Sequence, residues 1–385
     1  MQHRVIVVGG GYAGVIAANR LASGAAEGVI NVVLINPRDV FVERIRLHEF
    51  AAGSRADVVR PLSALLSPRV DLVIDSVVEM QPGHHVVVLA GGRTLSYDSL
   101  VYAPGSGAGG APHGARIVGT VECATLLRNR LDVLPSGGRI AVVGGGLTGI
   151  ETASELAEQR TNLSISLYTA GMIAPAIDPR SRARLRTGLR RVGVSIREHV
   201  TVSPAPDLAG ELGVDEVVWC AGFTSPTLAR DSGLRVDRRD RLILKHTLQS
   251  VEYPNIYGAG DACAIDGARY EFHRPSCASA MPMGGQAADN ILAALGGRAL
   301  RAHSQGYVAQ CISIGRKDAL IQFVHRDDTP VPWHIAGRSG AQFKEAVSRL
   351  TIRWLRREGR RYHAYTWASA PAPATPEPEK ANVRG

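Results

Sequence analysis

The sequence of 385 residues predicts an α/β protein with two similar nested units and a small third module. The first observation is that the apolar run Val5–Val8 leads directly into Gly9-x-Gly11-x-x-Gly14 and then into an alanine-rich segment. The second is that this order recurs, because residues 140–143 lead into Gly144-x-Gly146-x-x-Gly149 and another helical segment. The third is that the pattern changes beyond residue 312, where short strand-like runs precede one amphipathic segment.

Each repeated unit is predicted to be a buried strand, a tight turn and a helix, the order of the dinucleotide-binding fingerprint. In the first unit Gly9 permits the turn, Gly11 lets the backbone approach a pyrophosphate, and Gly14 lets the helix pack close to the strand. The pyrophosphate would lie at the helix N-terminus, where free N–H groups and the helix dipole favour an anion. Glycine-rich turns also occur for packing alone, but two correctly flanked copies predict two Rossmann-like domains and two dinucleotides.

The strands that follow the two units end without the acidic residue that usually hydrogen-bonds the ribose diol. The first strand ends at Asn36, which can still donate and accept hydrogen bonds, and Arg38 is close enough to contact the adenosine half. The second strand ends at Thr169, which leaves the choice between NADH and NADPH open. Three arginines nearby could pair with a 2′-phosphate or form a solvated helix face: Arg180, Arg182 and Arg184.

The segment Phe41–Glu49 is dense in charge beside apolar residues. It is interpreted either as an amphipathic helix with a solvated face or as one wall of a ligand pocket. In the second case Arg44, Arg46 or His48 would line that pocket. A strand is expected over Val70–Val78.

Later strands end in small residues, which suits a close approach of the backbone to a ligand. These turns contain Gly105, Gly222 and the pair Gly260-Asp261. Asp261 would bring a carboxylate against a polyol or a phosphate. Residues 281–286 then lead into an alanine-rich helix, whose N-terminus is expected to face a ligand.

Composition argues against several classes of protein. The five cysteines are scattered without a CxxC pair, which argues against a disulfide framework, a zinc site and a dithiol redox centre, so no metal is expected. No apolar run is long enough to span a bilayer, and the first strand begins too early to leave room for a signal peptide. A cytoplasmic protein is therefore expected. The net charge of +9 would suit nucleic acid or an anionic surface, depending on where the charge lies.

Most of this charge lies in the C-terminal region, around the helical segment Gln342–Arg357. Its apolar stripe consists of Phe343, Val347, Leu350 and Trp354. The stripe would pack on the protein or on a second subunit, with solvated arginines, or it would lie on an anionic membrane surface. From Ala368 onward the Pro/Ala/Glu mixture cannot build a core and predicts a disordered tail.

The two fingerprints and the element Gly258-x-Gly260-Asp261, in this order and spacing, make residues 1–312 resemble the flavoproteins with two dinucleotide-binding domains. This is the pyridine nucleotide-disulfide oxidoreductase superfamily, and the chain is most similar to its type II NADH dehydrogenases and apoptosis-inducing-factor-like oxidoreductases. The resemblance implies FAD along the first fingerprint and Asp261, and NAD(P)H as co-substrate on the second. It also implies that Glu151 lies near the contact of nicotinamide and flavin, as the catalytic residue.

The resemblance also implies a division of the chain into domains. Residues 1–110 and 245–312 would form the FAD-binding domain, 111–244 the NAD(P)H-binding domain, 313–367 a small α+β module with the basic helix, and 368–385 the tail. The residues expected to bind the cofactors are Gly9, Gly11, Tyr12, Ala13, Gly14, Asn36, Arg38, Arg44, Val78, Ala103, Gly105, Gly144, Gly146, Leu147, Thr148, Gly149, Thr169, Gly222, Gly260, Asp261, Pro282 and Met283.

We therefore expect an FAD-dependent oxidoreductase that passes hydride from NAD(P)H to FAD and then to an electron acceptor. The redox cysteines of related disulfide reductases have no counterpart in Phe41–Glu49, so thiol reduction is not expected. Quinone is one candidate acceptor, although Gln286 does not restore the glutamine-rich quinone motif of type II dehydrogenases. The alternative is a soluble flavin-dependent oxidase or tailoring oxidoreductase that acts directly on a small organic substrate.

A third class is a protein that binds nucleic acid or a partner through the basic C-terminus and keeps flavin for structure. The preferred expectation is instead a small-molecule acceptor and no nucleic acid. We also expect peripheral contact of residues 342–357 with the inner face of a membrane. The protein is expected to be a monomer or a homodimer.

Overall fold

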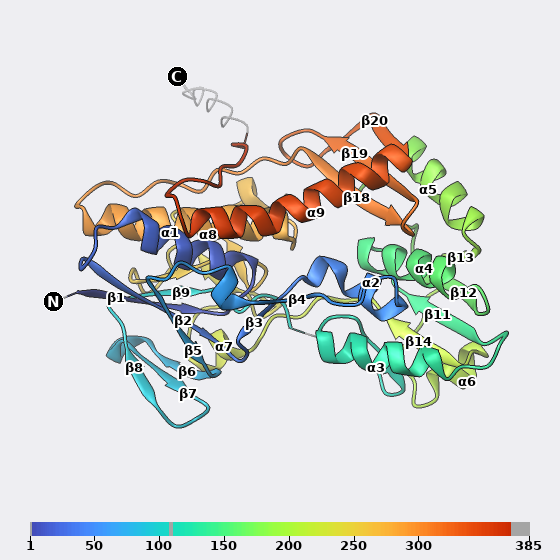
Figure 1. Cartoon of the computed structure of the whole chain (residues 1–385), viewed down its shortest axis with the longest axis horizontal. Coiled ribbons are helices and arrows are strands. Elements are labelled where there is room, and N and C mark those ends of the chain that lie inside the picture. The colour runs from blue at the N-terminus through green and yellow to red at the C-terminus, as the bar shows by residue number, and fades with distance from the viewer. Residues whose placement is uncertain (1, 108–110, 371–385) are drawn as a thin grey trace, which may run out of the picture.

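The computed structural model describes residues 2–107 and 111–370, and two parallel five-stranded sheets lie side by side in it (Figure 1). The first sheet has the order β16-β9-β1-β2-β5, with β1 (His3–Val8), β2 (Ile30–Asn36), β5 (Val70–Ile74), β9 (Ser99–Tyr102) and β16 (Ile256–Gly258). The second has the order β10-β14-β11-β12-β13, with β10 (Ala115–Arg116), β11 (Arg139–Val143), β12 (Ser164–Thr169), β13 (Val194–Glu198) and β14 (Glu216–Trp219). The strand before each glycine turn is therefore central in its sheet, and the predicted α/β class with two Rossmann-like units is confirmed.

Helices cover the faces of both sheets. The first sheet packs against α1 (Tyr12–Gly24) and α8 (Cys277–Leu295), and the second unit contains α3 (Val121–Asp132), α4 (Leu147–Gln159), α5 (Pro179–Arg191) and α6 (Leu208–Leu212). Strand β1 begins with the polar residues His3 and Arg4 and is apolar from Val5 onward, where Val5, Ile6 and Val7 are fully buried. Helices α1 and α8 cross closely, since a Cβ at Gly284 would overlap the carbonyl oxygen of Ala13.

Helix α8 begins earlier than expected. Residues 281–286 were expected to precede a helix N-terminus, but the helix starts at Cys277, where the Ser276 hydroxyl caps the N–H of Ser279. Pro282 and its neighbour Met283 therefore lie inside the helix. Proline removes the N–H that would bond the carbonyl of Ala278, and Gln305 Nε2 donates to that oxygen instead, at 2.9 Å.

Two further segments differ from the expectation. Phe41–Glu49 is not one helix but comprises β3 (Val40–Val42), the short 3₁₀ turn η1 (Arg44–Arg46) and the start of α2 (Leu47–Ala52). The strand expected over Val70–Val78 breaks after Ile74, because β6 (Val77–Gln81) leaves the first sheet and pairs antiparallel with β7 (Val86–Leu89). The remaining short elements of this half are β4 (Val59–Pro61), β8 (Thr94–Ser96) and the 3₁₀ turns η2 (Leu62–Ala64) and η3 (Pro82–His84).

Some residues before 244, which were assigned to the second unit, pack on the first unit. The helix α7 (Leu228–Asp231) and the strand β15 (Leu242–Leu244) contribute Ala229, Leu242 and Leu244 to the core of the first unit. Strand β15 pairs with β17 (Cys263–Ile265), which precedes the 3₁₀ turn η4 (Ala268–Tyr270). We therefore propose that the chain returns to the first unit between β14 and α7.

The C-terminal module consists of an antiparallel sheet and one long helix, which runs across the top of the molecule in Figure 1. Its elements are β18 (Ala309–Ile314), β19 (Asp318–Val324), β20 (Pro330–Gly337) and α9 (Arg338–Glu358). The end of α9 is fastened to α1 by the buried Arg20, whose Nε lies 2.5 Å from Glu358 Oε1. Leu355 is fully buried and the ring centroids of Trp354 and Tyr365 lie 5.4 Å apart, so the C-terminal end of α9 is docked on protein.

The chain continues in ordered form past residue 367. Gly306 N donates to Ala368 O at 2.7 Å, and Ala370 N donates to Ser304 Oγ at 3.2 Å, so the expected disordered tail does not include residues 368–370. The rest of that expectation, residues 371–385, lies outside the described residues. Within the described ranges, no helix is long and apolar enough to cross a membrane.

Candidate functional site

The first glycine turn is crowded at two of its glycines and open at the third. A Cβ at Gly9 would overlap the carbonyl oxygen of Ala103, and one at Gly14 would overlap that of Gly9. A Cβ at Gly11 would meet no described atom within 4 Å. Gly11 is also the N-cap of α1 and offers no side chain to the free N–H groups of the first turn. The open side of Gly11 therefore fits a phosphate group that takes these hydrogen bonds.

The second turn repeats this arrangement. A Cβ at Gly144 would lie 2.8 Å from the carbonyl of Cys220, and one at Gly149 would overlap the oxygen of Gly144. A Cβ at Gly146, the N-cap of α4, would again meet no described atom within 4 Å. Two equivalent cradles are therefore present, one for each dinucleotide.

The residues that end the strands next to the cradles stabilise the turns. Asn36 Oδ1 accepts from Gly10 N at 2.9 Å, and a Cβ at Gly145 would overlap Thr169 Oγ1. Of the arginines near Thr169, Arg182 is buried and donates to Pro175 O and Ile177 O, both at 2.9 Å. Arg184 pairs with Asp318 at 2.8 Å, so these two form neither a solvated face nor a phosphate site, whereas the third arginine, Arg180, is exposed.

A cavity of about 410 Å³ lies where the two units and the C-terminal module meet. It is lined by residues of α1, of the segment that contains η1 and α2, of the N-terminus of α4, of the segment before α8, of β18 and of α9. Seven of the predicted residues line it: Tyr12, Arg44, His48, Leu147, Thr148, Glu151 and Asp261.

At one end of this cavity a buried carboxylate retains an unused acceptor. Ser106 Oγ donates to Asp261 Oδ2 at 3.3 Å, whereas Asp261 Oδ1 is buried with no partner among residues 2–107 and 111–370. Burial raises the pKa of Asp261, and nearby Arg44 opposes this shift. Arg44 is tied by its Nη1 to the carbonyl of Ser106 at 2.8 Å. An unpaired buried oxygen beside Gly260 (φ 82°) fits a hydroxyl of the FAD ribityl chain.

At the other wall Glu151 forms an ion pair with Lys344, which arrives from α9. Glu151 Oε1 also accepts from Ser313 N at 2.9 Å, so β18 fixes the carboxylate. Burial lowers the pKa of Lys344 from 10.5 to about 7. A lysine with such a pKa can hold or release a proton near neutral pH. Next to it, burial lowers the pKa of His48 to about 3, so that imidazole stays neutral.

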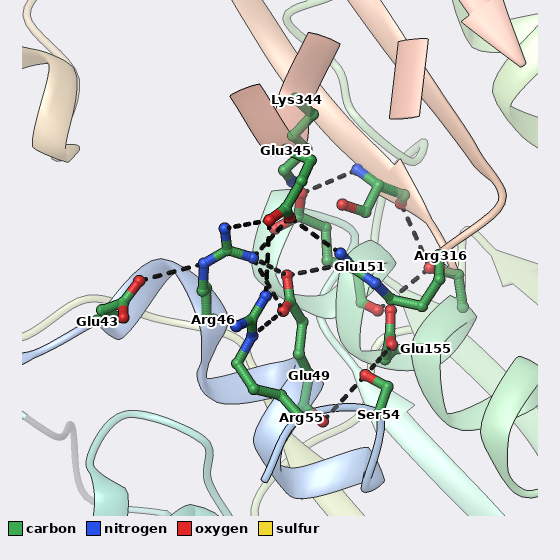
Figure 2. A network of polar contacts seen from close by, with 12 residues as sticks. Glu43, Arg46, Glu49, Ser54, Arg55, Glu151, Glu155, Arg316, Lys344 and Glu345 are labelled. Atoms are coloured by element: carbon green, nitrogen blue, oxygen red, sulfur yellow. Dashed lines mark hydrogen bonds and ion pairs between the residues drawn. The ribbon is translucent and has the colours of Figure 1, made fainter. Parts of the chain in front are cut away.

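A partly buried network of charges holds α9 in place behind this pair, and Figure 2 shows its members converging from α2, α4, α9 and the turn after β18. Arg46 Nη1 lies 2.9 Å from Glu345 Oε2 and 3.1 Å from Glu49 Oε2. Arg316 bridges the same two carboxylates, at 2.7 Å from Glu49 and 3.1 Å from Glu345. Because Glu345 directly follows Lys344, the network fixes the position of the ammonium in the cavity.

Two cysteines line the cavity, Cys277 at the start of α8 and Cys311 on β18. Burial raises the pKa of each thiol to about 11. Both therefore remain protonated at neutral pH, and a thiol is a poor nucleophile compared with a thiolate.

A second cavity, of about 330 Å³, opens beside the second cradle. It lies between Gly146 and the start of α4, the loop 174–177 and the segment before α8. The two cavities share Leu147, Thr148, Arg274 and Ser276, so they meet at these residues. A dinucleotide on the second cradle could therefore extend its reactive ring into the central cavity.

Several predicted residues lie away from the central cavity. Val78 is exposed on β6, and Arg38 pairs at the surface with Glu122 at 2.9 Å. Pro282 and Met283 lie inside α8. Ala13, Ala103, Gly105 and Gly222 lie in or beside the glycine-rich turns. Their contacts with cofactors remain predictions.

Two charged residues that line the cavity were not predicted, Lys344 and Arg274. Lys344 stands beside the apolar stripe of α9, and its neighbours Val347, Ser348 and Thr351 line the cavity too. The position of a lysine next to this run of apolar and small residues was a signal that it lines a pocket. The basic residues of this region were expected only to contribute surface charge. Arg274 carried no signal in the sequence. Among the described residues, no group of three or more His, Cys, Asp or Glu side chains could hold a metal ion.

Comparison with known proteins identifies the family. Residues 3–287 match the family model of pyridine nucleotide-disulphide oxidoreductases. The NADH dehydrogenase-like protein YutJ of Bacillus subtilis (strain 168) is 24% identical over 275 residues, 68% of this chain and 77% of that protein. Ferroptosis suppressor protein 1 of Taeniopygia guttata is 26% identical over 341 residues, 83% of this chain and 88% of that protein.

Solved structures share the fold at low sequence identity. The sulfide:quinone oxidoreductase of Aquifex aeolicus matches with a TM-score of 0.77 and 18% identity, covering 92% of both chains. NDH2 of Plasmodium falciparum matches with a TM-score of 0.73 and 14% identity, covering 94% of this chain and 99% of that chain. Two dinucleotide cofactors, FAD and NAD(P)H, were predicted, and the two cradles offer one site for each. Because the family model covers far more than half of the sequence, the chain belongs to the pyridine nucleotide-disulphide oxidoreductase family, as an NAD(P)H-dependent flavin oxidoreductase.

Proposed function

We propose that this oxidoreductase passes electrons from NAD(P)H through FAD to a quinone. The observation that carries the proposal is the Glu151–Lys344 pair in the wall of a cavity that joins the second cradle. Reduction of a quinone consumes protons as well as electrons, and Lys344 can release a proton near neutral pH. The names of several relatives support a quinone acceptor, among them the type II NADH:quinone oxidoreductase of Haemophilus influenzae.

When bound, FAD supplies the ring that takes up hydride and passes electrons on. The chain's own residues bind, orient and move protons. Gly11 and Gly146 leave room for the two pyrophosphates, and Asp261 can accept a hydrogen bond from a hydroxyl. Lys344 Nζ is the proton donor to an acceptor oxygen in the cavity. Glu151 holds this ammonium in place.

Anaerobic stopped-flow mixing tests this proposal. Addition of NADH or NADPH to purified protein should bleach the flavin absorbance, and a later addition of ubiquinone-1 should restore it. Bleaching by a small organic substrate but not by either nicotinamide would contradict the proposal and favour an oxidase that acts on that substrate. Protein that purifies without flavin would contradict both.

We further propose that NADH is preferred over NADPH. Thr169 offers no charge to a 2′-phosphate, and Arg182 and Arg184 are engaged with carbonyl groups and with Asp318. The ratio of kcat/KM for the two nucleotides tests this, and a higher value for NADPH would contradict it.

The finer proposal on location is peripheral contact with a membrane through α9. The C-terminal end of α9 is docked, but Phe343 is 42% exposed beside the cavity wall, and the side chain of Arg349 is 77% exposed. An exposed arginine near an anionic membrane surface contributes about 1 kcal/mol to the free energy of membrane binding. Flotation with anionic liposomes should therefore occur at low salt and be lost at high salt. Protein that stays in the soluble fraction at low salt would contradict membrane contact.

A further inference from the structure

Arg274 is placed at the junction of the two cavities. It lies in the segment before α8, which belongs to the first unit, yet it lines the cavity beside the second cradle as well as the central one. The other described residues that line the second cavity are uncharged: Gly146, Leu147, Thr148, Ala174, Pro175, Ala176, Ile177, Pro275, Ser276 and Gln310. A dinucleotide pyrophosphate carries negative charge, and in this cavity Arg274 is the cation that can face it.

The guanidinium of Arg274 is held in a fixed orientation. Its Nε donates to Asp328 Oδ2 at 2.7 Å, and its central carbon lies 4.5 Å from the centroid of the Tyr307 ring. Its backbone N–H donates to Tyr307 Oη at 3.1 Å, so main chain and side chain are tied to the same tyrosine. Gln310 Nε2 also donates to Asp328 Oδ2, at 3.2 Å. The side chain is 25% exposed, which leaves part of the guanidinium open to the cavities.

These contacts come from different parts of the chain. Asp328 follows β19 in the C-terminal module and Tyr307 precedes β18, whereas Gly146, which lines the same cavity as Arg274, lies in the second unit. A planar guanidinium that is already oriented loses little entropy when it binds a phosphate. The open face of Gly146 and the N-terminus of α4 would hold the same phosphate from the opposite side.

We propose that Arg274 binds the pyrophosphate of NAD(P)H across the junction of the two units, and that Asp328 is the positioning residue that orients it. This inference rests on the proposed function, because it concerns the nicotinamide nucleotide of the same reaction. The arginine acts on the phosphates and not on the reacting ring. Its loss should therefore weaken nucleotide binding and leave the limiting rate of flavin reduction nearly unchanged.

The test is single-turnover flavin reduction by NADH with Arg274→Gln. A hydrogen bond to a charged group contributes about 1.5–3 kcal/mol, so the Kd for NADH should rise about 10- to 100-fold. Arg274→Lys, which keeps the charge but loses the planar fork, should give an intermediate Kd. Asp328→Asn should raise the Kd by a smaller factor, because the guanidinium remains but is less well oriented.

Two controls separate this role from a structural one. Arg269→Gln removes the same charge from an exposed position five residues away and should leave the Kd for NADH unchanged. The artificial donor 1-benzyl-1,4-dihydronicotinamide has no phosphate, so it should reduce the flavin of wild type and of Arg274→Gln at equal rates. An unchanged Kd for NADH in Arg274→Gln would overturn the inference, and so would an equal loss with both donors. If neither donor reduces the wild-type flavin, it is the proposed function that fails.

Discussion

Glu155 is a fully buried carboxyl one helical turn beyond Glu151, and its replacement by glutamine makes a sharp test of the network in Figure 2. The Ser54 hydroxyl donates to Glu155 Oε1, whereas Oε2 is buried with no partner in the described part of the chain. Burial raises the pKa of Glu155 from 4.5 to about 7, although Ser54 and Arg316 oppose the shift. Glutamine has nearly the same shape, can still accept from Ser54, and carries no charge at any pH.

The sign of the pH effect follows from these pKa values. In the unfolded chain the carboxyl loses its proton near pH 4.5, whereas the folded protein holds it up to about pH 7. The stabilising effect of the neutral carboxyl is therefore complete below pH 4.5 and is lost as pH rises through 7. A shift of one pKa unit corresponds to 1.36 kcal/mol, so wild type loses about 3 kcal/mol across this window. Glu155→Gln should match wild type near pH 5 and be more stable at pH 8 by up to about 3 kcal/mol.

Thermal unfolding of the flavin-loaded protein at pH 5, 6, 7 and 8 measures this difference, which should reach several degrees in Tm at pH 8. Glu122→Gln is the matched control, because Glu122 is an exposed carboxyl whose ion pair with Arg38 contributes little. Its Tm should follow wild type at every pH. A constant difference between Glu155→Gln and wild type across the pH range, or a lower Tm at pH 8, would refute the reasoning.

Three further predictions address the cradle, the thiols and α9. Gly11→Val should fold with an unchanged far-UV spectrum but purify colourless, because its side chain enters the open space of the cradle; a yellow protein with full FAD content would contradict this. Cys277→Ser and Cys311→Ser should each retain most NADH-dependent quinone reduction, since neither thiol ionises at neutral pH; loss of activity with retained flavin would indicate a thiol mechanism. Leu355→Ala should destabilise by about 2–5 kcal/mol in denaturant unfolding if α9 is docked, whereas a change under 1 kcal/mol would place the helix elsewhere.

The cradles could be predicted because each constraint falls on a glycine of the motif, even where the crowding atom, such as the carbonyl oxygen of Ala103 beside Gly9, is distant in sequence. Gly9 and Gly14 must lack a side chain since neighbouring carbonyl oxygens fill the space, and Gly11 must lack one since a ligand needs it. A motif of six residues records all of these constraints, so the strand, turn and helix follow from the sequence alone. Both five-stranded sheets have the strand before the glycine turn, β1 or β11, at their centre, as the repeated motif predicts.

The remainder of the site depends on contacts that no local pattern records. Lys344 reaches Glu151 only because the C-terminal module packs the start of α9 against α4 of the second unit. The start of α8 was misplaced because Pro282 normally breaks a helix, and here Gln305 supplies the hydrogen bond that the proline cannot. The orientation of the Arg274 side chain depends on its hydrogen bond to Asp328, a residue more than fifty positions away.

The arrangement separates the binding of cofactors from the movement of protons. The cradles belong to the two units and are set by the backbone of β1, β11 and the helices that follow. The Lys344 ammonium belongs to α9, whose position depends on the Arg46–Glu345 pair near one end and on the Arg20–Glu358 pair near the other. A helix rises about 1.5 Å per residue, so these two anchors are about 20 Å apart and together fix its register along the molecule. A change in either anchor can therefore displace the proton donor while Gly11 and Gly146 remain in place, and its first effect should be on electron transfer to the acceptor rather than on the affinity for FAD or NAD(P)H.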